Sequence, residues 1–189
     1  MPEIRGATDA AAALWQALTG SALSTAKKAS TQQKVRAMMT RWGTTKNVAK
    51  KVGVSQRTVQ RWLKGEQEAK NTRRSANADK LNRAFREAKI TKGRADKFKS
   101  GGASPGIDPA SGRPIAGVGG ITIYGRFRVS EDERDRVINA GNYIPDGQLD
   151  RVIDVMIEHG PEAAVESLNT ILDNYVPGMQ TIAIYQIDY

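Results

Sequence analysis

The chain has 189 residues, of which 39% are hydrophobic, and a formal net charge of +9 at pH 7. This length allows one domain or two small ones, each with a modest core. The absence of cysteine excludes a disulfide framework and thiolate chemistry. No apolar run is long enough to span a bilayer, and the N-terminus lacks a secretory signal pattern. We therefore expect a cytoplasmic protein without a membrane partner.

The charge is divided unevenly along the chain. Residues 1–100 carry 23 lysines and arginines against 7 aspartates and glutamates, a balance of +16. Residues 101–189 carry 6 against 13, a balance of −7. A basic half joined to an acidic half predicts a polyanionic partner for the first half only. A membrane surface is the weaker alternative, because no cationic amphipathic helix with a large apolar face is found.

Two helices are predicted before the most basic stretch. Asp9 and the threonine before it can cap a helix through Ala10–Leu18, which ends near Gly20. Apolar residues recur at helical spacing from Val35 to Trp42, which predicts a second helix over residues 31–42. We expect this second helix to support the elements that follow it.

Residues 44–64, TTKNVAKKVGVSQRTVQRWLK, have the pattern of a helix-turn-helix. Ala49, Gly53 and Val59 lie at mutual spacings of four and six. These spacings suit a small residue where two helices touch, a glycine with positive φ in the turn, and an apolar anchor under the second helix. Ser55 is placed to cap that second helix. Four further positions are predicted to face inward: Val48, Val52, Val54 and Trp62.

The outward-facing residues of the second helix are polar or cationic. Amides and guanidinium groups can read base edges, and cations can bind phosphates. The residues predicted to contact DNA are Ser55, Gln56, Arg57, Thr58, Gln60, Arg61 and Lys64, followed by Arg73 and Arg74 in a loop or wing. The alternative is an ordinary amphipathic helix pair with a solvated basic face. The match over many positions favours binding to double-stranded DNA.

A basic helix and a linker follow this motif. An apolar stripe from Leu81 to Ala88 predicts a helix over residues 77–90. Residues 99–120 are rich in glycine, serine and proline, which predicts a flexible linker. The expected division is a basic helical domain over 1–98, the linker over 99–120 and an acidic domain over 121–189.

The acidic domain is predicted to be a small α+β unit of order β-α-α-α-β. Alternating apolar and polar residues predict a strand over 121–129. Ser130, followed three residues later by a glutamate, has the pattern of a capping box that opens a helix. Asp146 and Pro161 open two further helices, and β-branched residues over 181–187 predict a second strand. The whole chain is thus expected to combine a mainly α N-terminal helix-turn-helix domain with this α+β domain.

One polar face of the predicted strand is a candidate phosphate site. Tyr124, Arg126, Arg128 and Ser130 alternate, so they would project the same way along a regular strand. Guanidinium groups hold phosphate oxygens bidentately, and a helix N-terminus at Ser130 would favour an anion. Exposed strand residues beside an N-cap serine are the alternative interpretation. The sequence has no metal-ligand cluster and no phosphate-binding glycine-rich loop, so no metal and no cofactor is expected.

Several segments together resemble the telomere terminal proteins of actinomycete linear chromosomes and plasmids. They are SQRTVQRW (55–62), GGITI (119–123), SEDERDR (130–136) and YQIDY (185–189). Their order and the chain length are similar too, and the resemblance covers residues 31–189.

The resemblance implies a function and a set of partners. Such proteins bind telomeric DNA, become covalently joined to its 5′ end through a side-chain hydroxyl, and prime synthesis of the last fragment. The partners implied are telomeric DNA, a DNA polymerase and a second telomere-binding protein. We also expect both double-stranded and single-stranded telomeric DNA, and a second copy in a homodimer, among the partners. The family's linking threonine, which precedes acidic residues, corresponds by position to Ser130, with Thr122 and Tyr124 as alternatives. The chain would then be a protein primer and not a turnover enzyme.

Two other functions stay open beside this one. A helix-turn-helix transcriptional regulator would use the acidic domain to dimerise or to bind an effector. A plasmid replication or partition adaptor would use it to bind another protein. Terminal fragments of cellular DNA that change mobility after protease treatment would favour the terminal protein.

Overall fold

The structure, a computed structural model, divides the chain into two compact units. It describes residues 9–73, 75–99, 105–107, 114–119, 121–139, 147–173 and 177–189. The helical unit is Ser24–Thr91, and the sheet unit joins Met1–Leu23 to Lys92–Tyr189. The helical unit carries 18 lysines and arginines against 4 aspartates and glutamates, a balance of +14; the sheet unit carries 11 against 16, a balance of −5. The uneven charge of the sequence therefore follows the two units.

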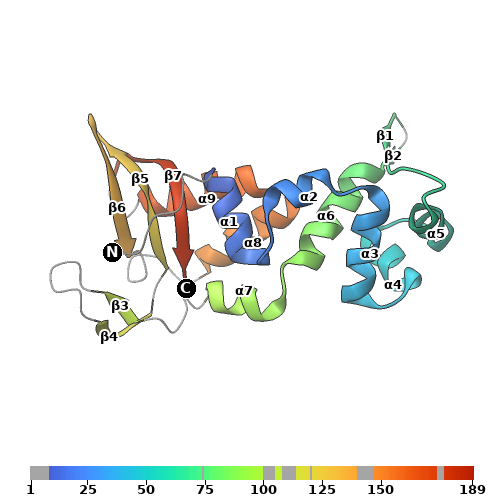
Figure 1. Ribbon diagram of the computed structural model, residues 1–189, viewed down its shortest axis with the longest axis horizontal. Helices are drawn as coiled ribbons and strands as arrows, with labels where there is room; N and C mark the ends of the chain where they lie inside the picture. The colour runs from blue at the N-terminus through green and yellow to red at the C-terminus, as the bar shows by residue number, and fades with distance from the viewer. Residues whose placement is uncertain are drawn as a thin grey trace. The chain divides into compact units, whose positions relative to one another are not determined.

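The helical unit is arranged around α3 (Thr31–Trp42). This helix contacts α4 (Thr45–Val52), α5 (Gln56–Lys64) and α6 (Asn77–Lys89), and α4 in turn contacts α5 and α6 (Figure 1). The predicted apolar stripes form one buried core, which includes Val35, Met38, Val48, Val52, Val59, Trp62, Leu81 and Phe85. Burying an aliphatic side chain of this kind stabilises the fold by about 1.5–3 kcal/mol. These helices are too short to be stable in isolation, so their stability comes from this packing.

Smaller elements complete the helical unit. α2 (Leu23–Lys28), whose residues from Ser24 onward belong to this unit, precedes α3. Strands β1 (Asn71–Thr72) and β2 (Ser75–Ala76) pair as an antiparallel hairpin between α5 and α6.

The turn between α4 and α5 has the predicted form. Gly53 adopts a left-handed conformation with φ 74° and ψ 41°, which costs glycine less than any other residue. The N–H groups of Gly53 and Val54 donate to the Ala49 carbonyl at 2.9 and 3.1 Å. The Ser55 hydroxyl then accepts the Thr58 N–H at 3.1 Å and caps α5. The predicted positive φ of Gly53 and the cap at Ser55 are both confirmed.

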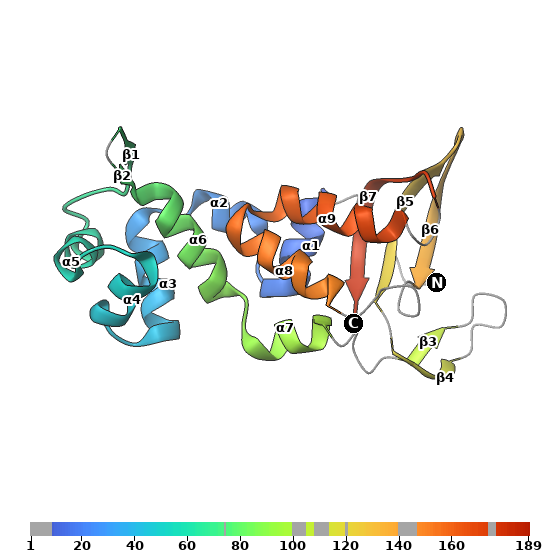
Figure 2. The same ribbon diagram turned by 180° about the vertical axis from the view of Figure 1, so that it is seen from behind.

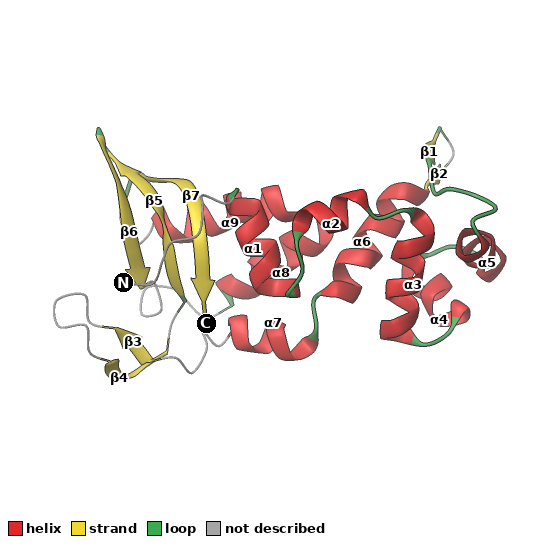
Figure 3. Cartoon of the chain, viewed as in Figure 1, coloured by secondary structure: helices red, strands yellow, loops and turns green. Residues whose placement is uncertain are grey.

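The sheet unit contains a three-stranded antiparallel sheet of order β6-β5-β7. Its strands are β5 (Thr122–Val129), β6 (Asp132–Asn139) and β7 (Met179–Asp188), drawn in yellow in Figure 3. Apolar residues of β5 are buried on one face, and its arginines are exposed on the other. At Gly125 the strands β5 and β7 approach so closely that a Cβ atom would collide with the Ala183 carbonyl oxygen.

Helices cover the packed side of this sheet unit. The described helices are α1 (Ala10–Thr19), α7 (Lys92–Lys99), α8 (Gln148–Glu158) and α9 (Pro161–Asp173). α1 and α9 both contact β7, and α8 lies beside α9 (Figure 2). The largest buried side chains include Leu14, Trp15, Leu18, Phe98, Phe127, Met156, Leu168 and Leu172. None of the helices that the structure describes is long and apolar enough to cross a membrane.

Two predictions for the end of the chain are confirmed. Pro161 is the first residue of α9, where its missing N–H leaves no helix bond unmade. The strand predicted over 181–187 is β7, and it pairs antiparallel with β5. Asp146, the predicted cap of the helix before Pro161, lies outside the described residues; α8 itself begins after Gly147.

The predicted helix after Ser130 is wrong, because residues 132–139 form β6. This strand pairs with β5 from Val129↔Asp132 to Thr122↔Asn139, and the described order is β-β-α-α-β. The physical reason is the cross-strand pairing of opposite charges that the hairpin register creates. This pairing, with the burial of Ile138 beside Ile123, outweighs the capping pattern.

The unit boundary differs from the predicted division at residues 98 and 99. The structure groups α1 and α7 with the sheet, although both belong to the basic half of the sequence. Trp15 of α1 is buried in the sheet unit. Phe98 of α7 is fully buried, and its ring meets Tyr189 edge-on with centroids 5.5 Å apart. The change of charge along the sequence predicts a boundary at residues 98 and 99. The apolar faces of α1 and α7 need buried partners, and this places both helices with the sheet.

Part of the predicted linker forms short strands. β3 (Pro105–Ile107) pairs antiparallel with β4 (Pro114–Gly119). Residues 100–104, 108–113 and 120 of the predicted linker lie outside the described residues.

Candidate nucleic-acid interface

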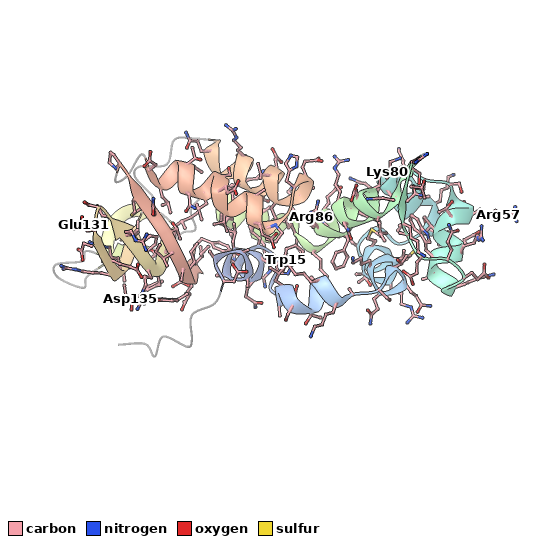
Figure 4. The ribbon with its side chains drawn as sticks, turned by 90° about the horizontal axis from the view of Figure 1, so that it is seen from above. Trp15, Arg57, Lys80, Arg86, Glu131 and Asp135 are labelled. Carbon is pink, nitrogen blue, oxygen red and sulfur yellow. The ribbon has the colours of Figure 1, made fainter. Side chains whose placement is uncertain are left out.

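Helix α5 presents a polar and cationic face to solvent. Val59 and Trp62 on its inner side are fully buried. The exposed residues opposite them follow helical spacing: Arg57, Gln60, Arg61 and Lys64. Figure 4 shows Arg57 extending away from the ribbon. Among the described residues, neither Arg57 nor Arg61 has a carboxylate partner, so both guanidinium groups can bind an external anion.

The first turn of α5 is fixed by hydroxyl groups. Besides capping the helix, the Ser55 hydroxyl lies 2.8 Å from the Thr58 hydroxyl. The amide of Gln56 donates from Nε2 to Oγ1 of Thr45, at the start of α4, at 3.0 Å. Ser55 and Thr58, both predicted to contact DNA, therefore hold the helix start. Gln56 keeps its amide oxygen and a second N–H for another partner.

The last turn of α5 is tied to α3. The Gln32 amide donates to the Leu63 carbonyl at 2.8 Å, which satisfies one of the carbonyls left open at a helix end. Lys64 lies 3.7 Å from Glu66, and both side chains are exposed. An exposed pair at this distance is weak, so Lys64 can exchange it for a phosphate.

The β1–β2 hairpin is held by its own polar contacts. The Ala69 N–H donates to the buried Thr31 hydroxyl at 3.1 Å, which links the preceding segment to α3. Oδ1 of Asn71 accepts the N–H groups of Ala78 and Asp79 at 3.0 and 3.3 Å. Asn71 therefore caps α6 from the hairpin, because the residue at the N-cap position makes no side-chain bond.

The hairpin carries part of the predicted basic wing. Arg73 is exposed and lies in the turn between the two strands, and Lys70, directly before β1, is exposed as well. Arg74, the other predicted contact, lies outside the described residues.

The helical unit also contains cations with structural partners. Lys51 of α4 forms an ion pair with Glu87 of α6 at 2.6 Å. Lys34 donates to Asn82 at 2.8 Å, and burial, followed by the nearby charge of Arg86, lowers the pKa of this lysine. Each of these contacts joins two helices. Lys34 and Lys51 therefore have a structural role and are not part of the exposed face of α5.

Ser130, the predicted attachment residue, lies at the tip of the β5–β6 hairpin. It occupies a two-residue loop with Glu131, its φ is 58°, and its side chain is exposed. It does not cap a helix, so the anion site expected at a helix N-terminus does not form there. Thr122 and Tyr124, the alternatives, lie within the central strand β5 and are half-buried.

The predicted phosphate clamp is engaged by carboxylates of β6. Arg126 Nε donates to Asp135 at 2.9 Å, and Arg128 donates to Glu133 at 2.9 Å. The Tyr185 hydroxyl also donates to Asp135 at 2.8 Å. The hydrogen bonds from Arg126 and then Tyr185 lower the pKa of Asp135 below its ordinary value. Figure 4 labels Asp135 and Glu131 in this hairpin.

Sequence reasoning missed Thr45 and Asn71. Thr45 meets Gln56 eleven residues away, and Asn71 caps a helix that begins six residues later. A local sequence pattern does not mark contacts made across a turn or a hairpin. Asparagine favours helix caps, but Asn71 lies six residues before α6, outside the N-cap position that a sequence pattern can mark.

The molecule thus combines a basic unit of short packed helices with a unit built on an antiparallel sheet. No protein-family model, curated protein or solved structure matches the chain.

Proposed function

We propose that the chain is a DNA-binding protein whose helical unit acts as a helix-turn-helix, with α5 as the recognition helix. The observation that carries this proposal is the exposed stripe of α5, in which Arg57 and Arg61 have no carboxylate partner among the described residues. An α-helix fits the major groove, where arginine pairs with guanine and glutamine with adenine. The charge of +14 on this unit favours phosphate binding as counterions are released.

The β1–β2 hairpin would act as the wing of this domain. Its exposed Arg73, together with the exposed Lys70 directly before β1, can bind phosphates beside the groove that α5 enters. Its attachment to α3 and α6 through Thr31 and Asn71 supports a fixed distance between these phosphates and α5.

The test replaces the two arginines of the α5 stripe one at a time. Arg57→Ala and Arg61→Ala should each weaken binding to a duplex measured by fluorescence anisotropy over a salt series. A lost base contact costs about 1–3 kcal/mol and relaxes specificity, and a lost phosphate contact lowers the salt slope by about one. Arg151→Ala, at an exposed arginine of α8, is the matched control. If both variants bind like the parent at every salt concentration, the recognition-helix assignment is wrong.

We further propose that this DNA-binding protein is a terminal protein of linear replicons, as the sequence resemblance implies. The favouring observation is the exposed Ser130 hydroxyl at a hairpin tip, because a protein primer must reach into a polymerase. Ser130 Oγ would give its proton to a base and attack the α-phosphorus of a deoxynucleoside triphosphate. The new O–P bond forms as the bond from that phosphorus to the β-phosphate oxygen breaks and pyrophosphate leaves. The base and metal would come from the polymerase, beside a second telomere-binding protein. Thr122 and Tyr124, within a central strand, are less accessible to such a partner.

Protein priming is tested by the adduct itself. Parent and Ser130→Ala are incubated with the polymerase of the same cells and labelled nucleotide, and the labelled protein is measured. Ser130→Ala should bind DNA normally and form no adduct, whereas Thr122→Val and Tyr124→Phe should retain it. An adduct that survives in Ser130→Ala and disappears in either other variant assigns the hydroxyl elsewhere. If the parent forms none, the transcriptional regulator replaces the terminal protein.

A further inference from the structure

The start of α5 is joined to the start of α4 by one side-chain hydrogen bond. Gln56, the first residue of α5, donates from its amide nitrogen to Oγ1 of Thr45, the first residue of α4, at 3.0 Å. Gln56 is exposed and Thr45 is half-buried. The bond therefore lies at the rim of the α5 face and not in the core.

This bond fixes the amide without exhausting it. A glutamine amide has two N–H donors and one acceptor oxygen, and Thr45 takes a single N–H. Adenine recognition in the major groove needs the remaining pair, with the oxygen accepting from N6 and the N–H donating to N7. Thr45 thus restricts the rotation of Gln56 while leaving free the two groups that a base would use.

We infer that Thr45 is a positioning residue for DNA readout: it orients the Gln56 amide so that α5 selects adenine at one position of its site. This inference rests on the proposed function, because it presupposes that α5 enters the major groove. Because the side chain is already held, less rotamer freedom is lost when DNA binds. Binding to the correct base is therefore more favourable than it would be with a mobile glutamine. Thr45 itself contacts no base.

A purely structural role for Thr45 makes a different prediction. If the bond only stabilised the α4–α5 pair, its loss would weaken binding equally for every DNA sequence. A positioning role changes the preference at one base pair, the same one that Gln56 reads. The decisive readout is therefore specificity by position.

The experiment selects preferred sites from a random duplex pool with the full chain and measures single-base variants of the best site. Gln56→Ala should abolish the preference for adenine at one position. Thr45→Val, which keeps the side-chain shape and removes the hydroxyl, should reduce the same preference about tenfold and leave the others unchanged. Thr45→Ser restores a hydroxyl and should restore the preference. Thr170→Val, at an exposed helical threonine of α9, is the control and should match the parent.

The outcomes separate the inference from the function on which it rests. Uniform weakening by Thr45→Val, or a Thr45→Val profile that matches the parent, overturns the positioning role while DNA binding stands. Loss of preference at a different position from that lost in Gln56→Ala also overturns it. A parent that enriches no sequence, with Arg57→Ala and Arg61→Ala binding as well as the parent, overturns the proposed function and this inference together. Thermal melts of each variant confirm that the comparison is between folded proteins.

Discussion

Single residues at the β5–β6 hairpin decide what the sheet face can bind. Arg126 and Arg128 each face a carboxylate across the strand pair, and Tyr185 adds a second donor to Asp135. A guanidinium group already held by a carboxylate must exchange that partner before it can hold a phosphate. The arginines of this face are therefore poorer anion sites than Arg57 and Arg61 of α5, which have no such partner among the described residues.

Replacing Arg126 should change the titration of Asp135. The bond from Arg126 lowers the pKa of Asp135 in the folded chain, so the pair stabilises the hairpin above the unfolded pKa of about 3.9 and loses this contribution as the pH falls through the lower folded value. Arg126→Ala should raise the pKa of Asp135 toward its ordinary value, and Tyr185→Phe should raise it less. An NMR titration of the Asp135 carboxyl carbon measures both. An unchanged titration in Arg126→Ala, with Arg151→Ala as control, would show that the pair does not form in solution.

At the scale of elements, sequence periodicity predicted the helices better than the strands. Apolar stripes in the local sequence mark six helices: α3, α4, α5, α6, α8 and α9. Gly53 and Ser55 mark the turn between α4 and α5. β6 was missed because its sequence, DERDRVIN, offers charges that suit either an exposed helix or an edge strand. The register with β5 decides between them, and a register is a non-local property that no short window contains.

The candidate interface was predictable to a similar extent. The exposed stripe of α5 follows directly from the positions of Val59 and Trp62, which must face inward. The bond between Thr45 and Gln56 depends on how two helices meet at the turn. Helix packing angles and side-chain rotamers determine that contact, and they are set only in the folded unit.

At the scale of the whole molecule, the charge difference between the units makes a prediction about fragments. A fragment spanning residues 24–91 should fold and bind DNA, since its core and its caps lie within it. It should bind more tightly than the full chain at low salt, because the attached unit of charge −5 repels phosphate until salt screens it. Anisotropy titrations at several salt concentrations, with circular dichroism to verify folding, measure this difference.

A fragment of residues 1–99 is the informative comparison. It keeps α1 and α7 but removes β7 and α9, so Trp15 and Phe98 lose the apolar partners that bury them. Gel filtration should show that this longer fragment self-associates and that the fragment of residues 24–91 is monomeric.

The DNA-binding comparison has an outcome that contradicts the prediction. If the full chain binds DNA more tightly than the fragment of residues 24–91 at every salt concentration, the sheet unit contributes contacts of its own.

The split of the sheet unit along the sequence has a consequence for synthesis on the ribosome. α1 is made before the helical unit and its contact β7 after it, and the Tyr189 hydroxyl donates to the Ala17 carbonyl at 2.5 Å. All of the helical unit is translated between them. The helical unit can therefore fold while α1 still waits, and its folding shortens the span of mobile chain that must close to bring α1 to β7. Folding of the inserted unit thus reduces the entropy cost of joining the two parts of the sheet unit, compared with an unfolded insertion of the same length.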